Sequence, residues 1–193
     1  MELYEAIARR RTVRGFTKPA TEETLRKIIM AGSMAASPIN SQPWEFIIID
    51  DPKRIEQIAE HKYQQNQKLF PGPTALAQKN NYKNSRVLAV CYKKGYGNRW
   101  AAWMCIQNMY LAATAEGLGV VPSELWGEDQ IAVEKLLGLP EDYKLAAVVL
   151  VGRQKGYPKV PKVKRRPEWS WLHRNQFGTN PKDLPEYSGR IKR

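Results

Sequence analysis

The sequence predicts a single α+β domain, and two kinds of pattern lead to that fold class. Short apolar runs at 44–49, 86–92 and 145–151 predict buried strands. Longer segments between them carry apolar residues at helical spacing, which predicts helices packed on those strands. At 193 residues the chain is long enough for one domain with a sizeable core, and it contains no internal repeat.

The N-terminal half begins with two predicted amphipathic helices, over residues 2–11 and from Thr21 to about 36. Thr21 is a suitable N-cap. The acidic residues that follow it, Glu22 and Glu23, interact favourably with the positive end of the helix dipole. After the strand at 44–49, the pair Asp51-Pro52 predicts the start of a third helix, because proline is well tolerated at the first helical position.

The segment 61–85 has a different composition from its surroundings. Eight of its residues are Gln or Asn, and Pro71-Gly72-Pro73 interrupts any periodicity. We therefore expect a surface excursion or lid here rather than part of the packed core.

The C-terminal half predicts a helix at 100–116 that is apolar nearly all round and ends at Gly117. Such a helix must be buried on most sides, either inside the domain or between subunits. A short strand at 119–122 and a helix at about 128–137 precede the central strand 145–151. After Gly152 the sequence turns into Pro-Lys repeats, which favour an extended arm lying across another surface.

The net charge of +12 is concentrated in that arm. Residues 155–193 hold 11 Lys or Arg against 3 acids, which gives +8. We divide the chain into a core at 1–155 and a basic arm at 156–193 that belongs to the same domain. The arm could touch nucleic acid or an anionic surface. We favour the alternative, in which it supplies a phosphate ligand and is otherwise solvated, so a nucleic-acid partner is not expected.

Several classes of protein are disfavoured. No apolar run approaches the roughly 20 residues that span a bilayer, and the N-terminus has no signal-like apolar core. We therefore expect a cytoplasmic protein that does not associate with a membrane. Cys91 and Cys105 lie in apolar surroundings and predict buried free thiols. Because no Cys/His cluster occurs, no metal site is expected.

Two segments point to a ligand. Arg9-Arg10-Arg11-Thr12-Val13-Arg14 places four arginines and a hydroxyl within six residues, and arginine forks bind phosphate bidentately. The polar loop from Ser37 to Trp44 runs directly into an apolar strand. Together they suggest a site for a phosphorylated, planar, amide-rich ligand. Alternatively, the arginines form a solvated helix end that complements the dipole, and the loop is an ordinary connection.

Glycine motifs for nucleotide binding are incomplete. Gly95-Tyr96-Gly97 stands between a strand and a helix, but the third glycine of the dinucleotide fingerprint is absent and Trp100 is too large for close packing. We interpret this segment as a turn. The sequence also lacks the GxxxxGK[ST], GxSxG and HExxH motifs.

Five motifs in order resemble the FMN-dependent nitroreductase superfamily, over about residues 2–178. They are Arg10-Arg11-Thr12-Val13-Arg14; Ala36-Ser37-Pro38-Ile39-Asn40-Ser41-Gln42-Pro43-Trp44; Gln107-Asn108 leading to Gly117-Leu118-Gly119; Leu137-Gly138-Leu139-Pro140; and Arg165-Arg166-Pro167-Glu168-Trp169 followed by His173. The resemblance implies a three-layer α-β-α sandwich with a C-terminal extended arm that packs on the partner subunit of a homodimer.

The resemblance also implies a cofactor site. FMN phosphate and ribityl would be held by Arg10, Arg11, Thr12 and Arg14, with Arg165 closing from the arm. The isoalloxazine ring or ribityl would be lined, from the partner subunit, by Ser37, Pro38, Ile39, Asn40 and Gln42. The segment Val121, Pro122, Ser123 and Glu124 would pass along the ring, and its residues other than proline would offer backbone N–H groups near N5 and O4. No protein nucleophile is required, because the flavin N5 carries the chemistry.

The implied function is an FMN oxidoreductase that moves hydride from NADH or NADPH to a small electrophilic acceptor such as a nitroaromatic or quinone. Two alternatives stay open. One is a flavin-binding redox sensor or storage protein without turnover. The other is a basic nucleic-acid-binding module, for which Trp169 and Trp171 beside the arginines of the arm would be the evidence.

Overall fold

The structure is a computed structural model that describes residues 1–13, 15–155, 166 and 170–179. Its elements, in chain order, are α1 (Leu3–Arg9), β1 (Phe16–Pro19), α2 (Glu22–Ser33), the 3-10 turn η1 (Pro38–Asn40), β2 (Trp44–Ile49), α3 (Pro52–Leu69), α4 (Pro73–Asn80), the 3-10 turn η2 (Asn81–Asn84), β3 (Arg86–Lys93), α5 (Asn98–Ala115), β4 (Gly119–Ser123), α6 (Gly127–Leu136) and β5 (Tyr143–Gln154). The predicted α+β class is confirmed.

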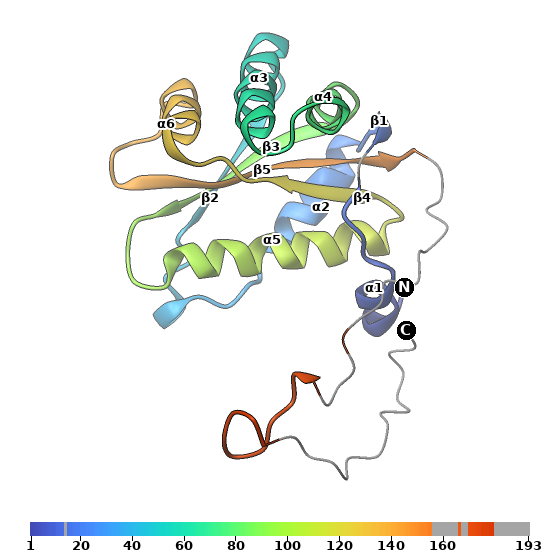
Figure 1. Cartoon of the computed structure of the whole chain (residues 1–193), viewed down its shortest axis with the longest axis vertical. Helices are drawn as coiled ribbons and strands as arrows, with labels where there is room; N and C mark the ends of the chain where they lie inside the picture. The colour runs from blue at the N-terminus through green and yellow to red at the C-terminus, as the bar shows by residue number, and fades with distance from the viewer. Residues whose placement is uncertain (14, 156–165, 167–169, 180–193) are drawn as a thin grey trace.

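The strands form one antiparallel sheet in the order β1-β5-β3-β2. Strand β4 pairs with the edge of β5 that is opposite to β1 and β3. Helices α3, α4 and α6 cover one face, and α2 and α5 cover the other (Figure 1). Along β3 the side chains alternate accordingly: Leu88 and Val90 pack with the α2–α5 layer, whereas Val87 and Ala89 pack on the opposite face. Both faces are therefore covered, which explains why β3 and β5 are nearly continuous apolar runs.

Several local predictions are confirmed. The Thr21 side chain accepts a hydrogen bond from the Thr24 N–H at the start of α2, and the Asp51 side chain accepts one from Lys53 N–H at the start of α3, where Pro52 occupies the first position. Strand β2 has the predicted bounds. Gly117 has a φ of 71° just after α5, in the left-handed region that ends many helices.

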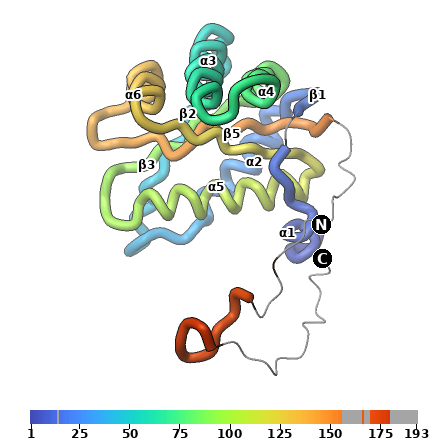
Figure 2. Tube along the Cα trace, viewed as in Figure 1, coloured from blue at the N-terminus to red at the C-terminus, as the bar shows by residue number. Residues whose placement is uncertain are grey.

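The prediction of a surface excursion at 61–85 is wrong. The segment continues α3, turns at Pro71-Gly72-Pro73 into α4, and forms part of the helical layer on the sheet (Figure 2). Gln65 is only 2% exposed, and the Asn66 side chain donates to the Gln78 Oε1 at 2.7 Å. Polar side chains that satisfy one another can be buried, so the Gln/Asn composition hid a packed helix pair.

Strand β1 was not predicted. Of its four residues only Phe16 is buried, and Pro19 removes one backbone donor. The strand forms by pairing with the end of β5, where Pro19 lies opposite Gly152. Among the described residues, no helix has the length and apolar character needed to cross a membrane.

Candidate functional site

The arginine-rich segment leaves α1 and lies against both α5 and β4. The Arg10 guanidinium carbon is 5.2 Å from the centre of the Tyr110 ring on α5, within the range of a cation–π contact. Thr12 forms an isolated parallel bridge with Val120 of β4. Burial raises the pKa of Tyr110, against the opposing effects of the Thr12 side-chain hydrogen bond and the Arg10 charge. These contacts fix Arg10 and Thr12 next to the start of β4.

Arg11 has a donor that lacks a partner among the described residues. Its Nη1 donates to the carbonyl oxygens of Ala8 and Arg10, each at 2.7 Å, at the end of α1. Its Nε is buried and has no hydrogen-bond partner within the part of the chain that the structure describes. A buried cationic donor without a partner is costly, and an anionic group such as a phosphate would satisfy it. Arg14 and Arg165 lie outside the described residues.

Strand β4 presents its second edge beside this segment. One edge pairs with β5 from Gly119 to Ser123, and on the other edge the pairing seen in the described residues is the single bridge at Val120. Val121, Pro122 and Glu124 are partly exposed. Ser123 points inward, where its hydroxyl accepts a 2.8 Å hydrogen bond from Tyr82. Only the backbone of Ser123 is therefore available to a ligand along this edge.

The end of β4 is held by side chains of α3 that the sequence did not single out. The Glu124 carbonyl oxygen accepts hydrogen bonds from the Lys62 Nζ at 2.7 Å and the Gln65 Nε2 at 3.1 Å. The Gln65 Oε1 in turn accepts from the Trp126 N–H at 2.9 Å, and the Lys62 Nζ lies 4.9 Å from the centre of the Trp126 ring. The Glu124 carboxylate pairs with Arg99 of α5 at 3.0 Å.

Lys62 is unusual because it is only 7% exposed. Burial lowers the pKa of its ammonium to about 8, and the negative charges of Glu124 and Asp129 oppose that fall. The sequence pattern of a buried lysine such as Lys62 is the same as that of a lysine on a solvated helix face. Its burial could not be predicted, because it results from the packing of α3 against the end of β4.

The loop 37–42 has an unusual backbone. Ile39, Asn40 and Gln42 have φ values of 46°, 56° and 43°, in the left-handed region, which is a genuine outlier for a β-branched residue such as Ile39. The Ser37 hydroxyl accepts from the Gln42 N–H at 3.0 Å and closes the loop, while the Ile39 side chain is fully exposed. Strain of this kind concentrates at ligand and partner sites.

The structure does not bring this loop to the arginines of the same chain. Pro38 packs on Gly97 at the start of α5, whereas Arg10 packs on Tyr110. Thirteen residues of helix separate the two positions, or about 20 Å, and the loop and α1 lie at opposite ends of α5 (Figure 1). One chain therefore joins Arg10, Arg11 and Thr12 with the segment 121–124, but leaves the loop 37–42 apart.

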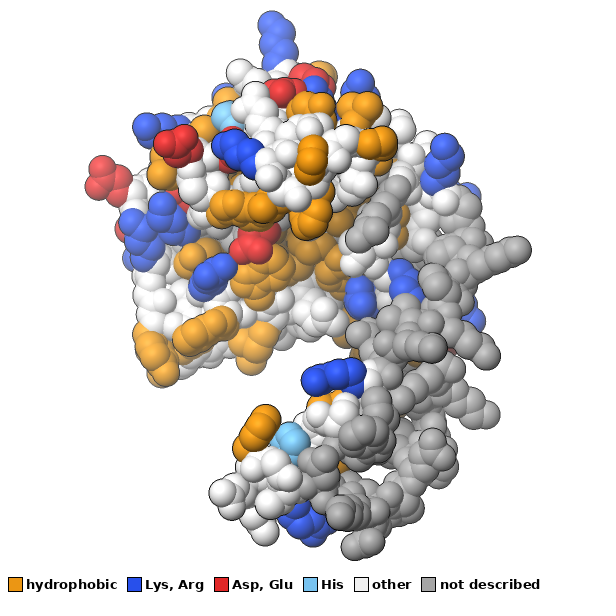
Figure 3. All heavy atoms as spheres, in the orientation of Figure 1, with side chains coloured by type: hydrophobic (Ala, Val, Ile, Leu, Met, Phe, Trp, Pro, Cys, Tyr) orange, Lys and Arg blue, Asp and Glu red, His pale blue; other side chains and the backbone are white. Residues whose placement is uncertain are grey.

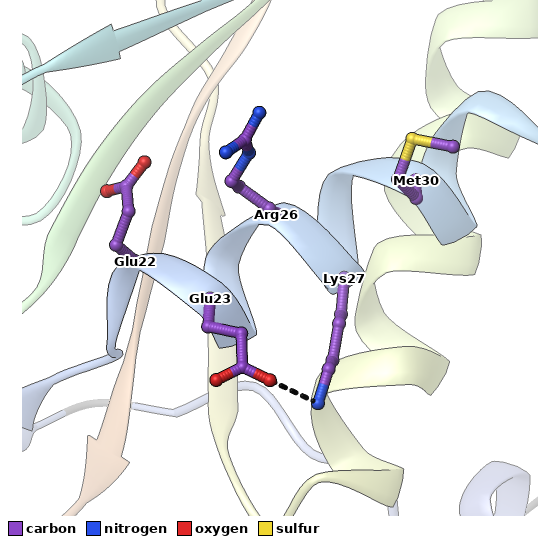
Figure 4. Close-up of a pocket in the computed structure, with 5 residues that line it drawn as sticks. All are labelled: Glu22, Glu23, Arg26, Lys27 and Met30. Atoms are coloured by element: carbon purple, nitrogen blue, oxygen red, sulfur yellow. Dashed lines mark ion pairs between the residues drawn. The ribbon is translucent and has the colours of Figure 1, made fainter.

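The face that carries β4 has an apolar surface. Hydrophobic side chains gather there around an acidic one, between the α3–α4 layer and α5 (Figure 3). A separate hollow on α2, lined by Glu22, Glu23, Arg26, Lys27 and Met30, consists of exposed side chains of one helix with a Glu23–Lys27 ion pair of 3.0 Å (Figure 4). That hollow gathers no groups from other elements, so β4 is the better site.

Other chemistries find little support in the described residues. No group of three or more His, Cys, Asp or Glu there could hold a metal ion. Cys91 and Cys105 are buried free thiols, as predicted, and burial raises the pKa of each to about 12. Both are therefore poor nucleophiles.

Comparisons with known proteins place the chain in a family. The profile of the Nitroreductase family matches residues 7–153. An iodotyrosine deiodinase of Thermotoga neapolitana is 29% identical over 84% of this chain and 91% of its own. An NADH dehydrogenase of Thermus thermophilus is 26% identical over 82% of this chain and 90% of its own. Among solved structures, an oxidised iodotyrosine deiodinase bound to FMN and 3-iodo-L-tyrosine superposes with a TM-score of 0.74 at 26% identity, covering 91% of this chain and 99% of that one.

Proposed function

The chain belongs to the nitroreductase family, and we propose that it is an FMN-dependent oxidoreductase that moves hydride from NADH or NADPH to a small electrophilic acceptor such as a nitroaromatic or a quinone. The observation that carries the proposal is the Thr12–Val120 bridge, which sets a cluster of phosphate-binding side chains at one end of an available strand edge. A phosphate and a flat, hydrogen-bonding ring are the two parts that such an arrangement fits.

The residues near β4 divide the work of binding. Arg10 and the Arg11 Nε, which has no partner among the described residues, supply positive charge for the phosphate, and Thr12 adds a neutral hydroxyl. The backbone of 121–124 supplies hydrogen-bonding groups along the ring, since the Ser123 hydroxyl is already engaged by Tyr82. Arg14 and Arg165 keep the phosphate-binding roles that the resemblance assigns to them.

FMN, when bound, supplies hydride transfer at its N5 position, so the protein needs no nucleophile of its own. The chain must instead orient the ring, leave one face open to donor and acceptor in turn, and place hydrogen-bond donors where negative charge develops. Pro122 and Glu124, which are partly exposed, would border that open face.

The site requires a second subunit. The loop 37–42 is about 20 Å from the arginines of its own chain, so we place it over the cofactor of a partner in a homodimer. Exposed apolar side chains on and beside α5 support this arrangement: Trp100 is 65% exposed and Met34 is 75% exposed. Exposed apolar patches of this kind mark interaction surfaces, and a partner subunit would cover the part of α5 that its own chain leaves exposed.

Steady-state turnover tests the proposed reaction. The purified protein should oxidise NADH or NADPH in the presence of a nitroaromatic or a quinone, with donor and acceptor reacting in separate half-reactions. A flavoprotein that oxidises neither nucleotide would favour the sensor or storage role instead. Turnover only with 3-iodotyrosine under a chemical reductant would place the chain beside the deiodinases to which it is similar.

A further inference from the structure

A buried lysine behind the proposed flavin site has no role in the reaction described above. The Lys62 ammonium is only 7% exposed, and it directs its charge at a backbone carbonyl, that of Glu124, rather than at a carboxylate. Burying a charge is costly unless it is well partnered. An apolar or neutral residue would fill the position at a lower desolvation cost. We therefore look for a function that requires the charge.

The carbonyl that Lys62 contacts has a second donor on the same side. Gln65, one helical turn further along α3, donates to the same Glu124 oxygen at 3.1 Å and accepts from the Trp126 N–H at 2.9 Å. Two side chains of one rigid helix therefore fix the peptide between Glu124 and Leu125. This peptide continues the segment proposed to run along the flavin.

The opposite side of that peptide carries a donor without a partner among the described residues. In a trans peptide the C=O and N–H point in opposite directions, and no peptide bond among the described residues is cis. Because the Glu124 carbonyl points to α3, the Leu125 N–H points away from α3. That N–H makes no hydrogen bond to any residue that the structure describes. Hydrogen bonds to the carbonyl polarise a peptide and make its N–H a stronger donor.

We propose that Lys62 and Gln65 are positioning residues that orient and polarise the Glu124–Leu125 peptide, so that it stabilises the negative charge that the bound flavin gains on reduction. The inference rests on the proposed function. It assigns a role in that function to the middle of α3, which does not contact the ligand itself. Gln65 sets the orientation, and Lys62 supplies the charge. Trp126, whose ring covers the ammonium, keeps it away from water.

The charge on Lys62 is also sensitive to pH. The charged groups around it are Glu124 at the end of β4, Asp129 on α6, His61 on α3 next to it, and Arg99 on α5, which pairs with Glu124. Burial lowers the pKa of Lys62 to about 8, so the ammonium loses its proton as the pH rises through that value. The stabilisation it provides should then fade, whereas an arginine in its place would keep its charge.

The test compares Lys62→Met, Lys62→Gln and Lys62→Arg with Lys68→Met in the FMN-loaded protein. Lys68 is a matched control because it lies on the same helix and also neighbours Asp129, at 3.9 Å, but its side chain is 73% exposed. The readouts are the FMN dissociation constant and the midpoint potential of the bound flavin. A tenfold weaker preference for the reduced cofactor corresponds to about 30 mV for a two-electron couple.

We expect Lys62→Met and Lys62→Gln to keep FMN but to lower the midpoint potential by about 30 mV or more. Lys62→Arg and Lys68→Met should stay near the parent at about pH 7, and from there to about pH 9 the parent should fall below Lys62→Arg. If Lys62→Met does not fold, the Gln and Arg variants decide the question. Parent-like potentials in Lys62→Gln with FMN bound would overturn this inference and leave the proposed function standing, whereas a parent that binds no FMN would overturn both.

Discussion

Thr12 pairs with Val120 across the outer edge of β4, and this one bridge links the arginine-rich segment to the strand that leads to Glu124. The two segments are separated by more than a hundred residues in sequence. Their contact makes the proposed phosphate-binding end and the proposed ring-binding edge part of the same surface.

Arg10→Ala should weaken FMN binding by about 10- to 100-fold, because a hydrogen bond to a charged group contributes about 1.5–3 kcal/mol. Flavin titration of the apoprotein measures the effect. Arg9→Ala is the matched control: Arg9 is the neighbouring arginine, but it pairs with Glu5 at 2.8 Å on the exposed side of α1. Equal losses of affinity in both variants would indicate a general charge effect rather than a site at Arg10.

Gly97→Ala should both destabilise the protein and displace the loop 37–42. A Cβ at Gly97 would lie 2.6 Å from the Pro38 Cγ, and its φ of 75° disfavours any side chain. The backbone strain contributes about 1–3 kcal/mol, and the clash adds to it. Gly138→Ala separates the two effects, since Gly138 has a φ of 69° with nothing within 4 Å of its Cβ.

Denaturant unfolding and FMN titration of both glycine variants provide the measurement. Gly138→Ala should lose stability but keep FMN affinity, whereas Gly97→Ala should lose both. An unchanged affinity in Gly97→Ala would mean that the loop does not contact the cofactor.

Tyr82→Phe should lower the free energy of unfolding by about 1–3 kcal/mol, because it leaves the buried Ser123 hydroxyl without its donor. The double variant Tyr82→Phe/Ser123→Ala should recover part of that loss, since both polar atoms are then removed. FMN affinity should not change in either variant. A large loss of FMN affinity would show that the Ser123 side chain, and not only its backbone, faces the ligand.

Met104→Asp should dissociate the proposed homodimer and release FMN at the same time. Met104 is 44% exposed on α5 between the two ends of the helix, and an obligate interface buries more than about 2,000 Å² of largely apolar surface. Light scattering combined with flavin absorbance follows both events. Ile131→Asp, at a similarly exposed apolar position on α6, is the control. A monomer of Met104→Asp that retains FMN would refute the shared site.

The sequence predicted those elements whose local pattern reflects their surroundings. Strand β2 was placed at its observed bounds because it is a short apolar run between a polar loop and a helix cap. Strand β1 was missed because its pairing with β5, rather than its own composition, makes it a strand. The helices α3 and α4 were misjudged because their buried side chains are polar and satisfy one another.

The candidate site also contains some residues that the sequence singles out and others that only the structure reveals. Arginines and a hydroxyl next to each other in sequence make Arg10 and Thr12 candidates without any structure. Lys62 and Gln65 could not be found, because a lysine and a glutamine on a helix look the same whether they face water or a buried carbonyl. The distance between the loop 37–42 and the arginines also depends on topology, since only the course of α5 shows that they lie apart.

The visible spectrum of the purified protein, followed by identification of the pigment released on heating, tests the central claim most directly. The account predicts a yellow protein with flavin absorbance that releases FMN rather than FAD. A colourless protein that cannot be reconstituted with FMN would contradict the account.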